Sequence, residues 1–119
     1  MAKINVCELL KTHNLLSPDK GKELRHKILS LLKKNKEIIL NFEGYKYIST
    51  TFRNESIGKL IVDKELSDDE LTSRIKWENI SEDDETDFQI AIENAKTRLH
   101  LIENNIDPEE FYRANLPTT

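Results

Sequence analysis

Residues 37–52 have the sequence EIILNFEGYKYISTTF, and this stretch decides which fold the chain adopts. It begins with the apolar run Ile38-Ile39-Leu40, which is rich in β-branched residues and lacks the alternation of a half-exposed strand. A continuous apolar run of this kind predicts a central strand over about 37–42 that is covered on both faces. Glu43-Gly44 interrupts the run, so the strand is expected to end there.

The end of the same stretch carries three consecutive hydroxyl residues. Ser49, Thr50 and Thr51 follow a predicted loop over 45–48, and each is a residue type that caps helices. We therefore expect a second helix over about 52–62. Its apolar spacing predicts four buried residues: Phe52, Ile57, Leu60 and Ile61.

The segment before this stretch predicts an edge strand and a first helix. Residues 2–10 alternate loosely between apolar and polar, which is typical of an edge strand or of a strand-like lead-in. Ser17-Pro18-Asp19 combines a capping hydroxyl, a proline for the first helical position and an acid for the first turn. The helix that begins there extends to about residue 35 and buries one stripe of residues: Leu24, Ile28, Leu31 and Leu32.

The segment after it predicts a loop, a strand and two further helices. The acidic residues 63–72 are expected to form a surface loop, and residues 74–80 alternate with period two, like a strand that packs Trp77 in the core. Ser81 and the acids after it predict a long third helix. Asp107-Pro108 predicts the start of a short fourth helix, and residues 116–119 are expected to be loose.

Strand and helix alternate along the chain, as in a layered α/β domain with parallel neighbouring strands. We predict an α/β fold with a small mixed, mostly parallel sheet of about four strands, packed with three to four helices. A chain of 119 residues is long enough to bury one core without disulfides or metal. The predicted division is one domain over 1–106, followed by a short helix and tail over 107–119.

The composition limits the classes of partner. Eighteen Lys/Arg against 22 Asp/Glu give a net charge of −4, which makes the chain a poor general binder of nucleic acid or anionic membranes. Neither is therefore expected as a direct partner. The N-terminus lacks the apolar run of a signal peptide, and no apolar stretch approaches the roughly 20 residues of a membrane span. We expect a soluble, cytoplasmic protein.

The charge is distributed unevenly along the chain. Residues 1–62 contain twelve Lys/Arg and six Asp/Glu, a net charge of +6, whereas residues 63–94 contain three and twelve, a net charge of −9. This distribution suggests steering toward a partner with a basic patch. The alternative is a solvated acidic loop and the acidic first turn of a helix. An acidic interface would consist of Asp68, Asp69, Glu70, Glu82, Asp83 and Asp84.

No motif for catalysis or cofactor binding is present. The sequence contains neither GxxxxGK[ST] nor GxGxxG, and His13, His26 and His100 do not form a pair at metal-ligand spacing. Cys7, the single cysteine, can form neither an internal disulfide nor a structural zinc site by itself. We expect a protein that is not an enzyme, has no catalytic residues and uses no cofactor or metal.

Several short motifs occur in a defined order between residues 17 and 79. They are Gly21 with Glu23-Leu24-Arg25, then Asn41-Phe42-Glu43-Gly44, then Ile48-Ser49-Thr50-Thr51-Phe52 followed by Glu55, Gly58, Lys59 and Leu60, and a strand ending at Asn79. In this pattern the segment resembles a STAS-like domain. These small α/β domains are related to the anti-sigma-factor antagonists and to the cytoplasmic domain of sulfate transporters.

The resemblance implies a non-enzymatic regulatory module that binds a protein partner, by analogy a GHKL-type ATPase or kinase. In the antagonists, the turn before the second helix holds a serine that a partner kinase phosphorylates. Thr50 stands at that position and is the candidate phosphoacceptor, while Ser49 and Asn41 stand where acidic residues are common and Thr51 and Phe52 replace a serine and a glycine. The implied partner-binding residues are Tyr45, Tyr47, Ser49, Thr50, Thr51, Arg53 and Glu55.

Other interpretations of the same sequence stay open at this point. The three hydroxyls are explained equally well as helix caps alone. An acidic stoichiometric inhibitor, for instance one encoded by a mobile element, would use residues 63–94 to block a basic or nucleic-acid-binding groove. A nucleotide-binding or enzymatic role is a third hypothesis, since some domains related to the resembled family bind nucleotides. The pattern is compatible with a monomer and with a homo-oligomer.

Overall fold

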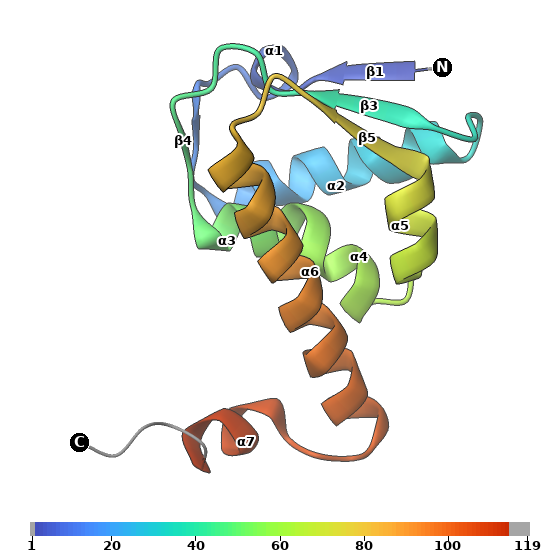
Figure 1. Ribbon diagram of the computed structural model, residues 1–119, viewed down its shortest axis with the longest axis vertical. Helices are drawn as coiled ribbons and strands as arrows, with labels where there is room; N and C mark the ends of the chain where they lie inside the picture. The colour runs from blue at the N-terminus through green and yellow to red at the C-terminus, as the bar shows by residue number, and fades with distance from the viewer. Residues whose placement is uncertain (1, 115–119) are drawn as a thin grey trace.

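A computed structural model describes residues 2–114 of the chain (Figure 1). The elements follow one another as β1 (Ala2–Asn5), α1 (Val6–Leu10), β2 (Asn14–Leu15), α2 (Pro18–Leu32), β3 (Ile38–Asn41), β4 (Tyr47–Ile48), α3 (Thr50–Arg53), η1 (Asn54–Gly58), α4 (Lys59–Val62), α5 (Asp68–Arg74), β5 (Ile75–Glu78), α6 (Glu82–Glu103) and α7 (Pro108–Ala114). The predicted α/β class is confirmed, and in place of one mixed, mostly parallel sheet of about four strands the chain forms two small parallel sheets.

The main sheet has three parallel strands in the order β1-β3-β5. Ile4 of β1, Leu40 of β3 and Trp77 of β5 are in register and face the layer of helices α2, α4 and α6, which lies on one side of the sheet (Figure 1). The opposite face carries the register Lys3, Ile39 and Lys76, of which both lysines are exposed. The prediction that the central strand is covered on both faces is therefore wrong.

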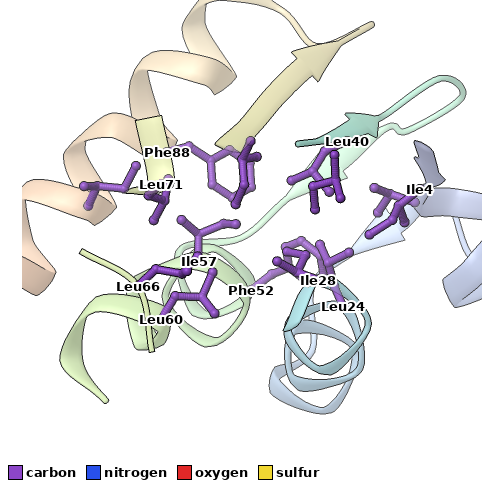
Figure 2. Packing of buried hydrophobic residues seen from close by; sticks show 14 of the residues in the cluster. Ile4, Leu24, Ile28, Leu40, Phe52, Ile57, Leu60, Leu66, Leu71 and Phe88 are labelled. Atoms are coloured by element: carbon purple, nitrogen blue, oxygen red, sulfur yellow. The ribbon is translucent and has the colours of Figure 1, made fainter. Parts of the chain in front are cut away.

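The core lies between the sheet and the helices. Figure 2 shows Leu40 of the sheet above Ile28 of α2 and Phe52 of α3. The side chains of Phe42, Phe52 and Phe88 are fully buried. Trp77 stacks on Phe42, with ring centroids 5.9 Å apart, in agreement with its predicted role in packing. Phe88 of α6 contacts both rings, with centroid distances of 5.7 Å to Phe42 and 4.9 Å to Trp77, so these contacts join the strand ends to α6.

The second predicted helix is present as a continuous run of α3, η1 and α4 over residues 50–62, referred to below as the central helix. Its middle segment, η1, is π-helical, and there the Ser56 hydroxyl donates a hydrogen bond to the carbonyl of Phe52 at 2.7 Å. Both α2 and α6 pack against η1, and Ser56, Ile57 and Gly58 are buried between them. This helix therefore lies inside the helical layer, and its exposed residues are Thr50, Thr51, Asn54 and Lys59.

Three local predictions are corrected by the structure. Residues 2–10 are not one strand, because the chain turns from β1 into α1 at Val6. The acidic segment is not a continuous loop, since Ser67 and Glu70 form a reciprocal capping box that starts α5. Residues 45–48 are not all loop, because β4 pairs with β2 in a separate two-stranded parallel sheet. The strands thus form two small sheets of three and two strands.

The helix starts were predicted more accurately than the strands. Ser17 caps α2 and Ser81 caps α6 through their side chains, each accepting a hydrogen bond from a backbone N–H in the first turn. The predicted fourth helix is present as α7, while the predicted tail over 116–119 lies outside the described residues. Within the described part of the chain, none of the helices combines the length and apolar character that a membrane crossing requires.

Candidate functional site

The three hydroxyl residues form a tight turn at the start of the central helix, called the hydroxyl turn below (Ser49, Thr50 and Thr51). Ser49 is its N-cap: the Oγ accepts a hydrogen bond from the backbone N–H of Phe52 at 3.0 Å. The same hydroxyl donates to the carbonyl of Leu16 at 2.8 Å. Ser49 is therefore fully engaged in fixing the turn, and its role is that of a cap.

The two threonines of the hydroxyl turn are exposed. The Oγ1 of Thr50 accepts a hydrogen bond from Nη2 of Arg53 at 3.1 Å, and Nη1 of the same guanidinium donates to the carbonyl of Ile48 at 3.1 Å. A cation is thus held beside the Thr50 hydroxyl by two hydrogen bonds. Thr50 and Arg53, which were predicted to share a site, lie together.

Two large apolar side chains are exposed next to the hydroxyl turn. Tyr47 is 66% exposed and Leu16 is 49% exposed, and both lie in or beside the short β2–β4 pair. The backbone N–H of Ser49 donates to the carbonyl of Leu15 at 2.9 Å, which holds Leu16 next to the turn. Leu16, Tyr47 and Thr50 therefore belong to one surface, here called the turn surface.

Leu16 is not among the predicted site residues, although the sequence contains a signal for its exposure. It precedes the N-cap Ser17, a position from which an apolar side chain often packs on the fourth helical residue. In this chain that residue is Gly21, which offers no side chain to pack against. Because the fourth helical residue has no side chain to cover it, the apolar side chain before the cap is expected to stay exposed.

Tyr45 does not belong to the turn surface. As an implied partner-binding residue it was expected at the surface, but it is half-buried, and its Oη donates to Oδ2 of Asp84 at 2.7 Å and accepts from the backbone N–H of Ser81 at 3.0 Å. Its ring stands edge-on to Phe42. Tyr45 therefore fixes the start of α6 against the end of β3, and its expected exposure is wrong.

Glu55 is turned toward α2 rather than toward solvent. The buried guanidinium of Arg25 donates from Nη1 to the backbone carbonyl of Glu55 and lies 3.4 Å from its Oε2. Lys59 Nζ lies 3.8 Å from the same carboxylate oxygen. Gly21 completes the contact, since a Cβ at this position would meet the Cβ of Glu55. These contacts fix the central helix on α2, and they join Arg25 to Glu55, which lies 30 residues later in the chain.

Asn41 takes part in a ladder of carboxamides across the ends of the three parallel strands. Its Nδ2 donates to Oδ1 of Asn5 at 2.9 Å, and its Oδ1 accepts from Nδ2 of Asn79 at 2.7 Å and from the backbone N–H of Glu43 at 3.2 Å. Asn79 has a positive φ of 55°, a conformation that asparagine tolerates better than most residues. The ladder holds the carboxyl edge of the sheet next to the turn after β3.

The residues of the predicted acidic interface do not form one cluster. Asp68, Asp69 and Glu70 occupy the first turn of α5, and Glu82, Asp83 and Asp84 occupy the first turn of α6. Lys96 Nζ binds Oδ2 of Asp68 at 3.0 Å, and Lys96 lies 14 residues after Glu82 on the same helix, which is about 21 Å at a rise of 1.5 Å per residue. The two acidic groups are thus well separated.

A hollow of about 530 Å³ lies between the central helix, α6 and α7. Its small side chains are Gly58, Ala91 and Ala95. Its two cations are paired, Lys59 with Glu55 at 3.8 Å and Arg98 with Glu109 at 3.1 Å. With both cations paired, the hollow offers weaker evidence for a functional site than the turn surface does.

The remaining reactive side chains are dispersed or buried. Among residues 2–114, no group of three or more His, Cys, Asp or Glu side chains is arranged to hold a metal ion. The Cys7 thiol is buried, and loss of hydration raises its pKa above the ordinary value. This favours the neutral, less nucleophilic thiol.

One protein family model matches the chain, that of a STAS-like domain of unknown function (DUF4325), over residues 20–85. The match covers 66 of the 119 residues, more than half of the chain. It includes most of α2, the hydroxyl turn, the central helix and β5. No curated protein and no solved structure matches the chain.

Proposed function

The chain belongs to the family of STAS-like domains, and we propose that it is a non-enzymatic regulatory module that binds a protein partner through the turn surface. Membership of the family indicates a protein-interaction module. We further propose that the protein is cytoplasmic and that its partner is a GHKL-type ATPase or kinase. The proposed binding through the turn surface rests on one observation, the exposure of Leu16 and Tyr47 beside the hydroxyl turn.

Exposed apolar side chains beside fixed polar groups suit a protein interface. Aromatic side chains are enriched among the residues that dominate binding energies, and Tyr47 presents 66% of its surface to solvent. The backbone beneath it is held by the β2–β4 pairing and by the Ser49 cap. A surface held in one conformation loses little entropy when a partner binds.

Thr50 gives the same surface a way to be switched. A phosphoryl group on its Oγ1 would add about −1.5 to −2 charges and three acceptor oxygens, within reach of the Arg53 guanidinium that already binds this hydroxyl at 3.1 Å. The change would convert a neutral and cationic patch into an anionic one. A partner fitted to the unmodified surface would then be released by repulsion or by the cost of desolvating the phosphate.

The proposal is tested by affinity purification from the native host with wild-type, Tyr47→Ala and Thr50→Glu proteins as bait, followed by mass spectrometry. One protein partner is expected with the wild type, and its recovery should fall at least tenfold with either variant. The same experiment reports whether Thr50 of the recovered chain carries a phosphoryl group.

Matched variants control for non-specific effects of the substitutions. Tyr112→Ala removes another exposed tyrosine, and Thr72→Glu adds the same charge at an exposed threonine of α5. Both should recover the partner as well as the wild type. If Tyr47→Ala and Thr50→Glu retain the partner as well as the wild type does, the turn surface is not its binding site. The same comparison is made with the purified partner.

A further inference from the structure

The exposed face of α2 and the turn after it is strongly basic. Five lysines on this segment are exposed, while the opposite side of the helix is buried through residues such as Leu24 and Ile28. The only acids on the exposed face of α2 are Asp19 and Glu23. The five lysines, called the lysine face below, are Lys22, Lys27, Lys33, Lys34 and Lys36.

In the described part of the chain, the lysine face gathers five unpaired cations on one segment, whereas seven of the thirteen other basic side chains are paired. Seven basic side chains elsewhere or on the buried side of α2 form ion pairs: Lys3, Arg25, Lys59, Lys64, Arg74, Lys96 and Arg98. Within residues 2–114, no lysine of the lysine face forms an ion pair. Their charges are therefore not neutralised within the described fold.

Four of these lysines, two in α2 and two directly after its last residue, follow two lines along the helix direction. Lys27 and Lys34 are seven residues apart, and Lys22 and Lys33 are eleven apart, so at 3.6 residues per turn each pair returns to within about 20° of one line. The cations therefore lie along both sides of the exposed face, with Glu23 and Ser30 between them.

The acids of residues 63–94 lie mainly in two places: α5, whose Arg74 donates to the carbonyls of Leu32 and Asn35 at the end of α2 and in the turn after it, and the first turn of α6. The acidic first turn of α6 belongs to a helix that packs on η1, and α2 packs on η1 as well, so the central helix separates them. Figure 1 shows α2 and α6 as separate helices around the central one. The molecule extends 43 × 31 × 24 Å, and at 0.1 M salt the Debye length is about 10 Å. The net charge of −4 therefore does not describe the field at the lysine face.

We propose that the lysine face binds the phosphate backbone of double-stranded nucleic acid without sequence specificity. A protein partner would require an apolar or aromatic anchor, and none of the exposed large hydrophobic residues lies on α2: they are Leu16, Tyr47, Ile90, Ile102, Ile106, Phe111 and Tyr112. The face carries no Phe, Tyr or Trp side chain, and this also disfavours single strands, whose bases bind by stacking on such rings. Rows of unpaired lysines match a backbone of regularly spaced phosphates.

This inference goes beyond the proposed function, because the surface is separate from the turn surface. The lysines lie along the outward side of α2, whereas Leu16, Tyr47 and Thr50 lie before that helix and at the start of the central one. A domain with both surfaces would bring a protein partner to nucleic acid.

The test is the binding of a fluorescent 20-base-pair DNA duplex to the full chain, followed by anisotropy between 50 and 200 mM salt. A dissociation constant in the range of roughly 10⁻⁴–10⁻⁶ M is expected, with a salt slope of about −3.6 if four phosphates are neutralised. Replacing Lys22, Lys27, Lys33 and Lys34 together by Gln should weaken binding at least tenfold at the lower salt concentration. A second duplex of unrelated sequence should bind equally well.

A charge-matched variant provides the control. Replacing Lys3, Lys64, Lys76 and Lys96 by Gln changes the net charge by the same amount at exposed or half-exposed lysines away from α2, and it should bind the duplex nearly as the wild type does. Circular dichroism and thermal melting of both variants check that they are folded.

The inference is overturned if the wild type does not bind the duplex at 50 mM salt, or if both quadruple variants lose the same affinity. It is also overturned if poly-glutamate or vesicles containing phosphatidylserine displace the duplex at equal charge concentration, since the face would then serve an acidic protein or a membrane surface.

Discussion

Gly21 of α2 lies directly against Glu55 of the central helix: a Cβ built on Gly21 would stand 2.8 Å from the Cβ of Glu55 and 3.1 Å from the carbonyl oxygen of Phe52. One turn further along α2, Arg25 donates to the backbone carbonyl of the same Glu55. A close helix approach and a charged hydrogen bond thus fix two helices at one point. The turn surface at the start of the central helix depends on this point for its position.

Gly21→Ala is predicted to destabilise the protein. The added methyl group would meet backbone and Cβ atoms that cannot rotate away, and overpacking of this kind costs roughly 1–3 kcal/mol, against a gain of about 1 kcal/mol in helix propensity. The expected loss is about 1 kcal/mol in the free energy of unfolding, measured by urea denaturation.

Gly58→Ala is the matched control for this prediction. A Cβ on Gly58 would meet its nearest atoms at 3.8 Å, an ordinary contact distance, so the gain in helix propensity should prevail and stability should stay equal or rise by up to about 1 kcal/mol. If Gly21→Ala were as stable as Gly58→Ala, the close approach of α2 to Glu55 would not exist.

Arg25→Ala is predicted to cost more than Glu55→Gln. Removal of the buried guanidinium leaves both the carbonyl and the carboxylate of Glu55 without this donor, and loss of such a charged hydrogen bond costs about 2–3 kcal/mol. Glu55→Gln keeps the carbonyl acceptor, so its cost should be only about 1 kcal/mol. Equal losses from the two variants in urea denaturation would mean that the carbonyl bond contributes nothing.

Asn41→Ala is predicted to weaken the carboxyl edge of the sheet. It removes the amide that links Asn5 and Asn79 and that accepts from the backbone of Glu43. Because Asn5 and Asn79 are exposed and water can replace part of these bonds, the expected loss of stability is about 1–2 kcal/mol.

Asn94→Ala serves as the comparison for Asn41→Ala. Asn94 is exposed on α6 and, within residues 2–114, its side chain forms no hydrogen bond of the kind found in the ladder, so its removal should leave stability unchanged or slightly raised. Hydrogen exchange of the amides in β3 and β5 should accelerate in Asn41→Ala and not in Asn94→Ala. Unaltered exchange in both would rule out a structural role for the ladder.

The helices could be predicted from the sequence because their signals are local. Ser17-Pro18 and Ser81 begin helices through bonds to residues three positions away, and such bonds are visible in the order of residues. The capping box of Ser67 and Glu70 is equally local, but the acidic composition of the segment predicts a loop and outweighs this signal. The error lay in giving composition more weight than spacing.

The features that were missed depend on contacts between distant residues. Whether Ile39 is covered depends on which side of the sheet the helices take, and the β2–β4 pair joins segments 33 residues apart, from Asn14 to Tyr47. Glu55 was assigned to the partner surface because its buried partner, Arg25, lies 30 residues earlier. A single sequence gives the residues of such contacts but not their pairing. Thr50 and Tyr47 are exposed, as a partner surface requires, whereas Tyr45 is half-buried through its hydrogen bonds to Asp84 and Ser81, which lie more than 30 residues away.

The Cys7 thiol is predicted to be protected in the native protein. Burial raises its pKa, so at pH 8 the native protein holds less of the reactive thiolate than the unfolded chain does, and alkylation by iodoacetamide should be roughly tenfold or more slower without urea than with it. The raised pKa also means that the folded state keeps the proton when the unfolded state has lost it. Stability should therefore fall as the pH rises from about the unfolded pKa toward the folded one.

This pH dependence is measured by urea denaturation at pH 8 and pH 10 for the wild type and for Cys7→Ala. Lysines and tyrosines titrate in the same range in both proteins, so the difference between them isolates the thiol. The wild type should lose more stability between the two pH values than Cys7→Ala does. Equal losses, or a native alkylation rate equal to that in urea, would show that Cys7 is not held in an apolar environment.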